Sequence, residues 1–321
     1  MRLLPLLGTT ASHQEREEPP INNSDRRTVL VAGGDSDPDL ATLAATLESA
    51  GLPYETLFVG PESHPRITWD FQNDRLTING EERRPQSLFI RYDVFTSMAD
   101  PRRAPAFRAL AWYTTVFGWA IAHPEVRMFN RESALHVTNK LHVLHLAREV
   151  GLEIPRTLVT NDRELLIAKS AQEPMIAKPV NGGDYTRELP DTLKNAPHRD
   201  GSLPAPSFVQ ERLVPPEVRV YSIGGRTFAF QLVADALDYR STSDCKVIPI
   251  DESTLPASLL EGLATLMERL SMDYGAADFK ACPETGALRF LEINNGPMFA
   301  AFDRACSGRL TRAMAGYLSE P

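Results

Sequence analysis

The sequence has few cysteines, a shortage of basic residues and no long apolar run, and each shortage excludes a class of protein. Its three cysteines, Cys245, Cys282 and Cys306, lack metal-ligand spacing and cannot all pair within one chain, so we expect a reduced, cytoplasmic setting. The 34 Lys and Arg are outnumbered by 42 Asp and Glu, and the net charge of −8 argues against a nucleic-acid partner. No stretch could span a membrane, and the apolar run after Arg2 is too short for an export signal.

What remains is the composition of an ordinary globular protein. With 321 residues, 42% of them hydrophobic and 24% charged, the chain can bury one extended core or two to three smaller ones. Residues 1–26 are rich in Glu, Arg, Pro and Asn, which predicts a disordered tail. No internal repeat is present, so the remaining length is divided among unlike lobes.

The first lobe is predicted to open with a β-α-β unit. An apolar strand at 28–32 is followed by Gly33-Gly34, a helical pattern up to Gly51, and a second strand at 54–59. A Gly-Gly loop after a first strand can bind a dinucleotide, but the spacing of the full fingerprint is absent. We therefore interpret this segment as the opening of an α/β lobe.

Later segments alternate between helix and strand patterns. The helical patterns cover 132–150 and 255–270, and a strand is expected at 175–178. Gly224-Gly225 separates two β-rich runs and predicts a hairpin. Residues 190–206 are rich in Pro, Asp and Gly, which predicts an exposed connection.

The last hairpin carries the most informative polar residues. The turn Pro283-Glu284-Thr285-Gly286 joins a strand containing Asp278 to one containing Glu292 and Asn294. Because side chains alternate across a strand, Glu292 and Asn294 share one face while Leu291 and Ile293 point to the core. Two carboxylates and an amide oxygen are ligands that Mg²⁺ prefers. The alternative is a half-buried hairpin with a polar outer face.

Three basic residues could meet phosphate. Lys178 ends a strand before Gly182 and Gly183, whose backbone amides can approach oxygens closely; the alternative is a surface lysine before a tight turn. Lys140 is either a phosphate ligand or a solvated helix lysine. Arg219 could stabilise phosphate or a substrate carboxylate, or form a cross-strand ion pair.

In order and spacing, the motifs from about Phe129 onward resemble those of the ATP-grasp superfamily, and within it the RimK-like ligases. The resemblance implies an α/β protein with α+β lobes: an N-terminal pre-ATP-grasp domain at 27–129, a central lobe at 130–207 and a C-terminal lobe with the metal site at 208–321. The nucleotide would lie between two antiparallel-sheet lobes. The motifs that carry the resemblance are Asn139-Lys140 and Ile176-Ala177-Lys178-Pro179 for the two nucleotide lysines, Gln210-Glu211-Arg212-Leu213 for the adenine hinge, Glu217-Val218-Arg219 for the ribose strand, and Asp278, Glu292 and Asn294 for the metal.

A closer resemblance is to the microviridin-type (graspetide) peptide maturases, because Asp238-Tyr239-Arg240 stands where those enzymes tend to carry Asp-Trp-Arg. It implies ADP-forming ligation through an acyl-phosphate, with ATP and Mg²⁺ or Mn²⁺, and an ester or amide bridge within a precursor peptide. Lys178, Arg219 and Arg240 would be the catalytic residues. Tyr239 and the displaced proline in Asn295-Gly296-Pro297 depart from the pattern. A RimK-like amino-acid ligase and an inactive nucleotide-binding scaffold are the alternatives, and a homodimer is compatible with all three.

Overall fold

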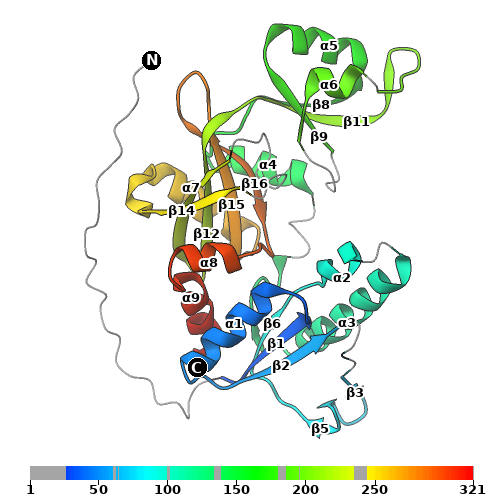
Figure 1. Ribbon diagram of the computed structural model, residues 1–321, viewed down its shortest axis with the longest axis vertical. Coiled ribbons are helices and arrows are strands. Elements are labelled where there is room, and N and C mark those ends of the chain that lie inside the picture. The colour runs from blue at the N-terminus through cyan, green and yellow to red at the C-terminus, as the bar shows by residue number, and fades with distance from the viewer. Residues whose placement is uncertain are drawn as a thin grey trace.

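The computed structural model describes residues 27–60, 63, 65–99, 102–133, 139–179, 186–194, 196–234 and 244–320. These residues form four sheets, which are covered by helices. Three of the sheets are stacked along the long axis of the molecule (Figure 1). Two of the three are antiparallel, so the mixed α/β class with two antiparallel-sheet lobes is confirmed. None of the helices in the described ranges is long and apolar enough to cross a membrane.

The N-terminal sheet is parallel and has the strand order β2-β1-β6-β7. Asp37 caps the first helix by accepting a hydrogen bond from the Asp39 amide at 2.8 Å, and Pro38 fits the first turn because it needs no amide donor. Alternate residues of the first strand pack against helices on opposite faces of the sheet. The elements of this part are β1 (Val29–Gly34), α1 (Pro38–Ser49), β2 (Tyr54–Val59), β3 (Ile67–Asp70), β4 (Arg75–Ile78), β5 (Glu81–Glu82), β6 (Ser87–Ile90), α2 (Val94–Ala99), α3 (Arg103–Ala122) and β7 (Arg127–Met128).

The small antiparallel sheet has the order β10-β9-β11-β8 and a core of its own, in which Leu166, Leu189 and Val209 are fully buried. Asp162 directly precedes its first helix, and its side chain caps that helix by accepting a hydrogen bond from the Leu165 amide at 3.0 Å, which is a common role for Asp at a helix start. Its elements are β8 (Thr157–Asp162), α5 (Arg163–Gln172), β9 (Met175–Pro179), β10 (Arg187–Glu188), α6 (Leu189–Lys194) and β11 (Ser202–Glu211).

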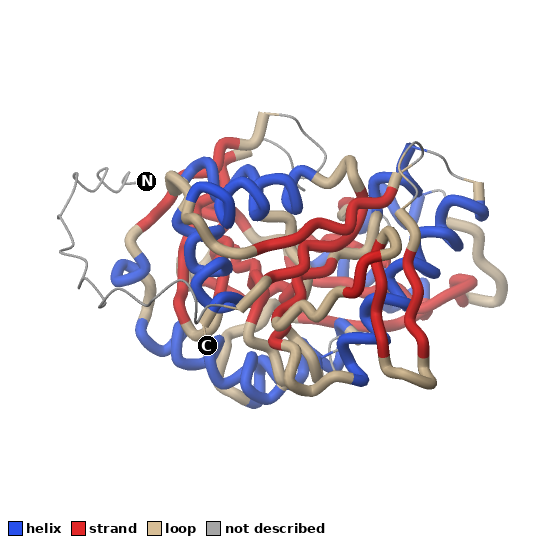
Figure 2. The backbone as a smooth tube through the Cα atoms, turned by 90° about the horizontal axis from the view of Figure 1, so that it is seen from below, coloured by secondary structure: helices blue, strands red, loops and turns tan. Residues whose placement is uncertain are grey.

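The central antiparallel sheet has the order β14-β13-β12-β15-β16 and packs α4 and α7 against one face. Gly224 and Gly225 both have positive φ, at 54° and 81°, and form the predicted hairpin turn. Figure 2 shows the strands lying between helices. The elements are α4 (Lys140–Glu149), β12 (Val214–Ile223), β13 (Arg226–Val233), β14 (Lys246–Ile250), η4 (Glu252–Thr254), α7 (Ala257–Arg269), β15 (Tyr274–Ala281) and β16 (Leu288–Asn294).

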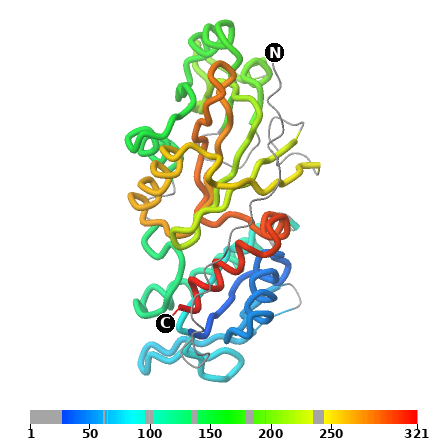
Figure 3. Tube along the Cα trace, turned by 90° about the vertical axis from the view of Figure 1, so that its left-hand side faces the viewer, coloured from blue at the N-terminus to red at the C-terminus, as the bar shows by residue number. Residues whose placement is uncertain are grey.

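The last two helices, α8 (Ala300–Ala305) and α9 (Arg309–Ser319), connect the central sheet to the N-terminal sheet. Figure 3 shows α9 lying beside α1, from which it is separated by more than 250 residues of sequence. Leu310, Met314 and Leu318 share one buried cluster with Leu40 and Leu43 of α1. The chain therefore closes back on its own first helix.

Two sequence predictions about local structure are corrected by the structure. Residues 190–206 are mostly exposed as expected, but they are more than a connection, because α6 covers Leu189–Lys194 and β11 begins at Ser202. A proline is tolerated in the first turn of a helix, so Pro190 does not prevent α6. The helix expected from Glu132 begins at Lys140, where the Asn139 side chain accepts hydrogen bonds from the amides of Leu141 and His142; residues 134–138 lie outside the described residues.

Candidate active site

A cavity of about 440 Å³ lies between the small sheet and the central sheet. It is lined by residues of β9, β11, β12, β15 and β16 and by the loop that follows β16. Most of the side chains singled out in the sequence converge on it. These are Lys178, Glu211, Leu213, Glu217, Arg219, Asp278, Glu292 and Asn294.

Asp278 and Glu292 are directly opposite each other on β15 and β16, and Asn294 pairs two positions further along with Ala276. The register then shifts between Asp278 and Phe279, so that β16 contains one extra residue. Ile293 is buried in the core as predicted, but Leu291 lines the cavity, because the bulge disturbs the alternation of faces. The expectation that Leu291 points to the core is therefore wrong.

The two carboxylates are already balanced by basic side chains. Arg219 Nε and Nη2 each lie 2.7 Å from an oxygen of Asp278, and both side chains are less than a tenth exposed. Lys140, the first residue of α4, places Nζ 2.8 Å from Glu292 Oε2. The cross-strand ion pair that the sequence allowed for Arg219 is thus present.

The donor set is compatible with a hard divalent cation. It consists of two carboxylates and one amide on adjacent strands, all facing the same cavity. No group of three or more His, Cys, Asp and Glu side chains suited to a metal occurs among the described residues, so substrate oxygens and water would have to complete the coordination. This is the way in which Mg²⁺ is usually held in nucleotide sites.

A second ion pair lies beside the first. Glu217 and Lys280 are opposed on β12 and β15, with Nζ 2.9 Å from Oε2. Burial raises the pKa of the Glu217 carboxyl above 4.5, and the charge of Lys280 opposes this rise. Lys280 was missed in the sequence, although it stands two positions from Asp278 and strand alternation places both on one face.

The predicted hinge is only partly exposed to the cavity. Leu213 lines it, whereas the Gln210 side chain is fully buried elsewhere and donates to Thr157 Oγ1 at 3.1 Å. Glu211 accepts a hydrogen bond from the Arg156 amide and forms ion pairs with Arg156 and Arg289. The predicted ligands Gly182, Gly183 and Arg240 lie outside the described residues.

The loop that follows Asn294 is held by side chains from other parts of the chain. Arg91 donates to the carbonyls of Gly296 and Pro297, at 3.1 and 2.9 Å. Asp39 accepts from the amides of Phe299 and Ala300, at 2.8 and 2.6 Å. The N-terminal lobe therefore fixes the backbone that forms one wall of the cavity.

A buried ion-pair cluster and two tyrosine hydrogen bonds also hold this loop in place. Arg91 also pairs with Asp37 and Asp39, at 2.8 and 3.1 Å, in a cluster that is almost wholly buried. Burial raises the pKa of the Asp39 carboxyl, and the charge of Arg91 opposes the rise. Tyr221 and Tyr274 donate to the carbonyls of Met298 and Pro297. With its backbone held in this way, Met298 keeps a side chain that is 47% exposed at the cavity.

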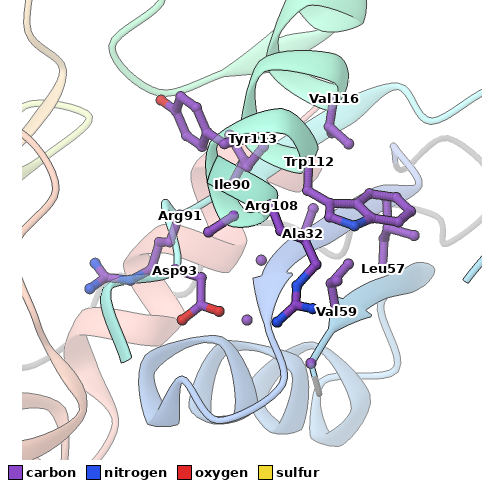
Figure 4. A pocket seen from close by; sticks show the side chains of 14 residues that line it. Ala32, Leu57, Val59, Ile90, Arg91, Asp93, Arg108, Trp112, Tyr113 and Val116 are labelled. Atoms are coloured by element: carbon purple, nitrogen blue, oxygen red, sulfur yellow. The ribbon is translucent and has the colours of Figure 1, made fainter. Parts of the chain in front are cut away.

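A separate, smaller cavity lies at the carboxyl ends of β1, β2 and β6 (Figure 4). The Asp93 carboxylate packs against Gly34, where an added Cβ would lie 2.5 Å from Asp93 Cγ. Gly34 therefore makes room for a side chain of the protein itself. In Figure 4 the Arg91 side chain points away from this cavity. Its hydrogen-bond partners are the carbonyls of Gly296 and Pro297.

No family model matches this chain, and no curated protein matches it. Among solved structures, the ATP-grasp ligase PsnB complexed with a minimal precursor matches with a TM-score of 0.69 and 25% identity, covering 92% of this chain and 99% of that one. PsnB with minimal precursor, Mg and ADP matches with a TM-score of 0.68 and 23% identity over 93% and 99%.

Two other proteins show the same fold. The macrocyclase MdnC bound with precursor peptide MdnA from Microcystis aeruginosa matches with a TM-score of 0.67 and 18% identity, over 91% of this chain and 99% of that one. D-alanyl-alanine synthetase A from Vibrio cholerae matches with a TM-score of 0.59 and 11% identity, over 92% and 98%.

Proposed function

We propose, from the premise that this chain is an ATP-grasp ligase, that it forms ester or amide bonds in a ribosomal precursor peptide with release of ADP. The observation that supports this most directly is the cavity that gathers Lys178, Glu217, Arg219 and the three oxygen ligands. PsnB, which shares the fold over nearly the whole of both chains, has been solved in complex with a minimal precursor. The graspetide resemblance of the sequence supports the same substrate class.

In this proposal the nucleotide occupies the cavity between the two antiparallel sheets. Lys140 and Lys178 bind phosphate oxygens, with Gly182 and Gly183 donating backbone amides. The backbone of Gln210, Glu211 and Leu213 receives the adenine. Because the Gln210 side chain is buried against Thr157, its contribution is to hold the hinge strand rather than to touch the base. The Glu217 carboxylate, held by Lys280, accepts from the ribose hydroxyls.

Asp278, Glu292 and Asn294 are the residues that would hold Mg²⁺, with Mn²⁺ as a substitute. When bound, the metal would neutralise phosphate charge and align the transferred group. Arg219 orients the Asp278 carboxylate through two charge-assisted hydrogen bonds. Lys140 does the same for Glu292, so a nucleotide phosphate and Glu292 would compete for this lysine.

The reaction has two steps. A carboxylate oxygen of the peptide attacks the γ-phosphorus, the bond to the bridging oxygen of ADP breaks, and an acyl-phosphate forms. A hydroxyl or amine of the same peptide then attacks the acyl carbon, and phosphate leaves with the electron pair of the broken bond and takes up the proton that the nucleophile loses. Arg219 and Arg240 stabilise the oxygen charge that develops, and no protein nucleophile is required.

The substrate is tested by ADP release from Mg²⁺ and ATP. Purified protein is incubated with the peptide encoded by a small neighbouring reading frame that is rich in Thr, Ser, Asp and Glu, and separately with pooled free amino acids. We expect peptide-dependent ADP and a mass loss of one water for each bond formed. ADP that depends on free amino acids instead would assign the chain to the RimK-like ligases. Nucleotide binding without ADP under either condition would favour the scaffold.

A further inference from the structure

A third cavity, of about 280 Å³, lies between the N-terminal sheet and the loop that follows Asn294. We call it the aromatic cavity, because six aromatic side chains line it: Phe89, Tyr92, Tyr113, Phe117, Phe129 and Tyr274. β7 pairs with Ser87 and Leu88 of β6, and the part of β6 beyond them borders the cavity. Sites for whole small molecules measure roughly 300–1,000 Å³, so this volume suits a single large side chain better than a nucleotide.

The rings of the aromatic cavity hold one another in place. Tyr113 stacks on Phe117, with ring centroids 5.4 Å apart and an angle of 12° between the planes. Tyr92 meets the Tyr113 ring edge-on at 6.1 Å, and Phe89 meets Tyr274 in the same way at 6.1 Å. Aromatic rings attract a further ring in stacked or edge-on geometry at centroid distances of about 4.5–7 Å, which an aliphatic side chain does not match. The lining therefore favours an aromatic ligand.

One hydroxyl in the aromatic cavity is available to a ligand. Tyr113 Oη has no hydrogen-bond partner among the residues that the structure describes, whereas the hydroxyls of Tyr92 and Tyr274 donate to backbone carbonyls. Burial raises the pKa of Tyr113 above its ordinary value, so the group stays a neutral hydroxyl that can both donate and accept. In Figure 4 the hydroxyl end of Tyr113 points away from the smaller cavity. A tyrosine in the ligand would satisfy this group, and a phenylalanine would not.

The loop that follows Asn294 separates the aromatic cavity from the large cavity. Among the described residues, Gly296 is the one that lines both. A Cβ added at Gly296 would meet no atom within 4 Å, so the space beside its backbone is open. Asn130 Nδ2 donates to the Asn295 carbonyl at 2.8 Å, and Arg91 donates to the Gly296 carbonyl at 3.1 Å. The loop is therefore a fixed rim between two cavities that a single peptide can reach.

We propose that the aromatic cavity is a subsite for the precursor peptide, which takes an aromatic side chain, by preference tyrosine, near the residue that reacts. This inference rests on the proposed function, which supplies the peptide. A single backbone is roughly 5 Å wide and an extended peptide rises about 3.3 Å per residue, so the aromatic residue lies about two to four positions from the reacting one. Bound in this way, it fixes the register of the peptide across the loop and so positions the reacting group.

The first test measures binding and needs no turnover. Saturation-transfer NMR is run with three acetylated and amidated tripeptides, Gly-Tyr-Gly, Gly-Phe-Gly and Gly-Leu-Gly. Both aromatic peptides should give stronger signals than the leucine peptide. Val94→Trp places a large side chain at the cavity and should reduce the aromatic signals about threefold or more.

Val159→Trp is the matched control for Val94→Trp. Val159 lies on β8, outside the aromatic cavity, and the two valines are 39% and 38% exposed. The control variant should give the signals of the wild type. Absence of any aromatic signal from the wild type, or equal signals in the wild type and Val94→Trp, would overturn the proposal.

A further variant tests the hydroxyl. Tyr113→Phe keeps the ring and removes only Oη, which has no partner in the described part of the chain to lose, so the Tm should not fall. The wild type should bind the tyrosine peptide about threefold more tightly than the phenylalanine peptide, and Tyr113→Phe should bind both equally. Circular dichroism of each variant checks the fold. A preference that survives in Tyr113→Phe would overturn the proposed selection of tyrosine.

The last test uses turnover and separates this proposal from the proposed function. With a precursor peptide that supports ADP release, replacing its aromatic residue near the reacting Asp or Glu by Ala should raise the peptide KM about tenfold and leave the KM for ATP unchanged. Val94→Trp should raise the KM of the original peptide to a similar extent and leave that of the Ala peptide nearly unchanged. A peptide KM that responds to neither change, with ADP still formed, would overturn the subsite alone. If no peptide supports ADP release, the proposed function fails, and the binding signals decide the subsite.

Discussion

Breaking the ion pair between Arg219 and Asp278 should cost more stability than any other single change in the cavity. The two residues are opposed on β12 and β15, they share two hydrogen bonds of 2.7 Å, and their side chains are 8% and 6% exposed. Removing one partner of such a pair leaves a buried charge and costs about 3–5 kcal/mol. Because both residues line a cavity that water can enter, we expect about 3 kcal/mol for Arg219→Met, the lower end of that range.

This loss should lower the Tm by about 6–12 °C, at 2–4 °C for each kcal/mol. Replacing both partners, as Arg219→Met with Asp278→Leu, removes the uncompensated charge, so the double variant should be far less destabilised than the sum of the single variants. Thermal and urea unfolding of the four proteins measures this coupling. Single-variant losses that simply add would refute the reasoning.

The neighbouring pair of Glu217 and Lys280 is a matched control. It lies on the same two strands, but it has one hydrogen bond of 2.9 Å and side chains that are 14% and 12% exposed. Its coupling should be smaller, at about 1 kcal/mol. Mg²⁺ with ADP should recover part of the lost Tm in Arg219→Met and none in Asp278→Leu, which has lost the carboxylate.

Three further predictions concern the cavity. Glu292→Gln should abolish peptide-dependent ADP release while changing the free energy of unfolding by less than about 1 kcal/mol, because the partner of Glu292, Lys140, is 44% exposed. Glu261→Gln on the outside of α7 is the control. Retained turnover in Glu292→Gln would contradict the metal role. Burial raises the pKa of Glu217 in the folded protein, so the contribution of this residue to stability is fully present below pH 4.5 and is lost as the pH rises through the folded pKa. The Tm of wild type minus the Tm of Glu217→Gln should therefore fall as the pH rises above 4.5. A difference that is flat or rises would contradict the raised pKa. We expect the loop that follows Asn294 to lie close to the acceptor group. Asp39→Asn keeps an oxygen for the loop amides but loses the charge that pairs with Arg91, so it should lower product formed per ADP released more than it lowers ATP binding. An unchanged ratio in coupled mass and ADP assays would contradict this role of the loop.

Local signals predicted most of the elements, and long-range contacts account for what was missed. The Gly224-Gly225 hairpin, the Asp162 cap and the convergence of Asp278 with Glu292 follow from turn chemistry and strand alternation within short segments. The bulge that turns Leu291 into the cavity depends on pairing with β15 and is not indicated by the sequence pattern of β16 itself.

The hydrogen bonds between the N-terminal lobe and the loop that follows Asn294 could not be predicted from the sequence either. Asp39 and Phe299 are 260 residues apart, and nothing in the vicinity of either indicates the other. The strand at 202–206 was not predicted, because prolines within a segment argue against a strand. The sheet accommodates them through a register shift between Ser202 and Ser207. The division into domains at 129/130 and 207/208, the roles of the site residues and the cytoplasmic location stay predictions.

The packing of α9 on α1 has a consequence for the order in which the protein can fold during synthesis. One face of the first helix packs on Leu310, Met314 and Leu318, which the ribosome adds more than 250 residues after α1. Although lobes generally fold as they emerge, this one keeps part of an apolar face uncovered until α9 has been synthesised. We expect nascent chains stalled before residue 309 to be cleaved readily by protease within 27–60, and protection of that segment at this stage would show that the first lobe closes without α9.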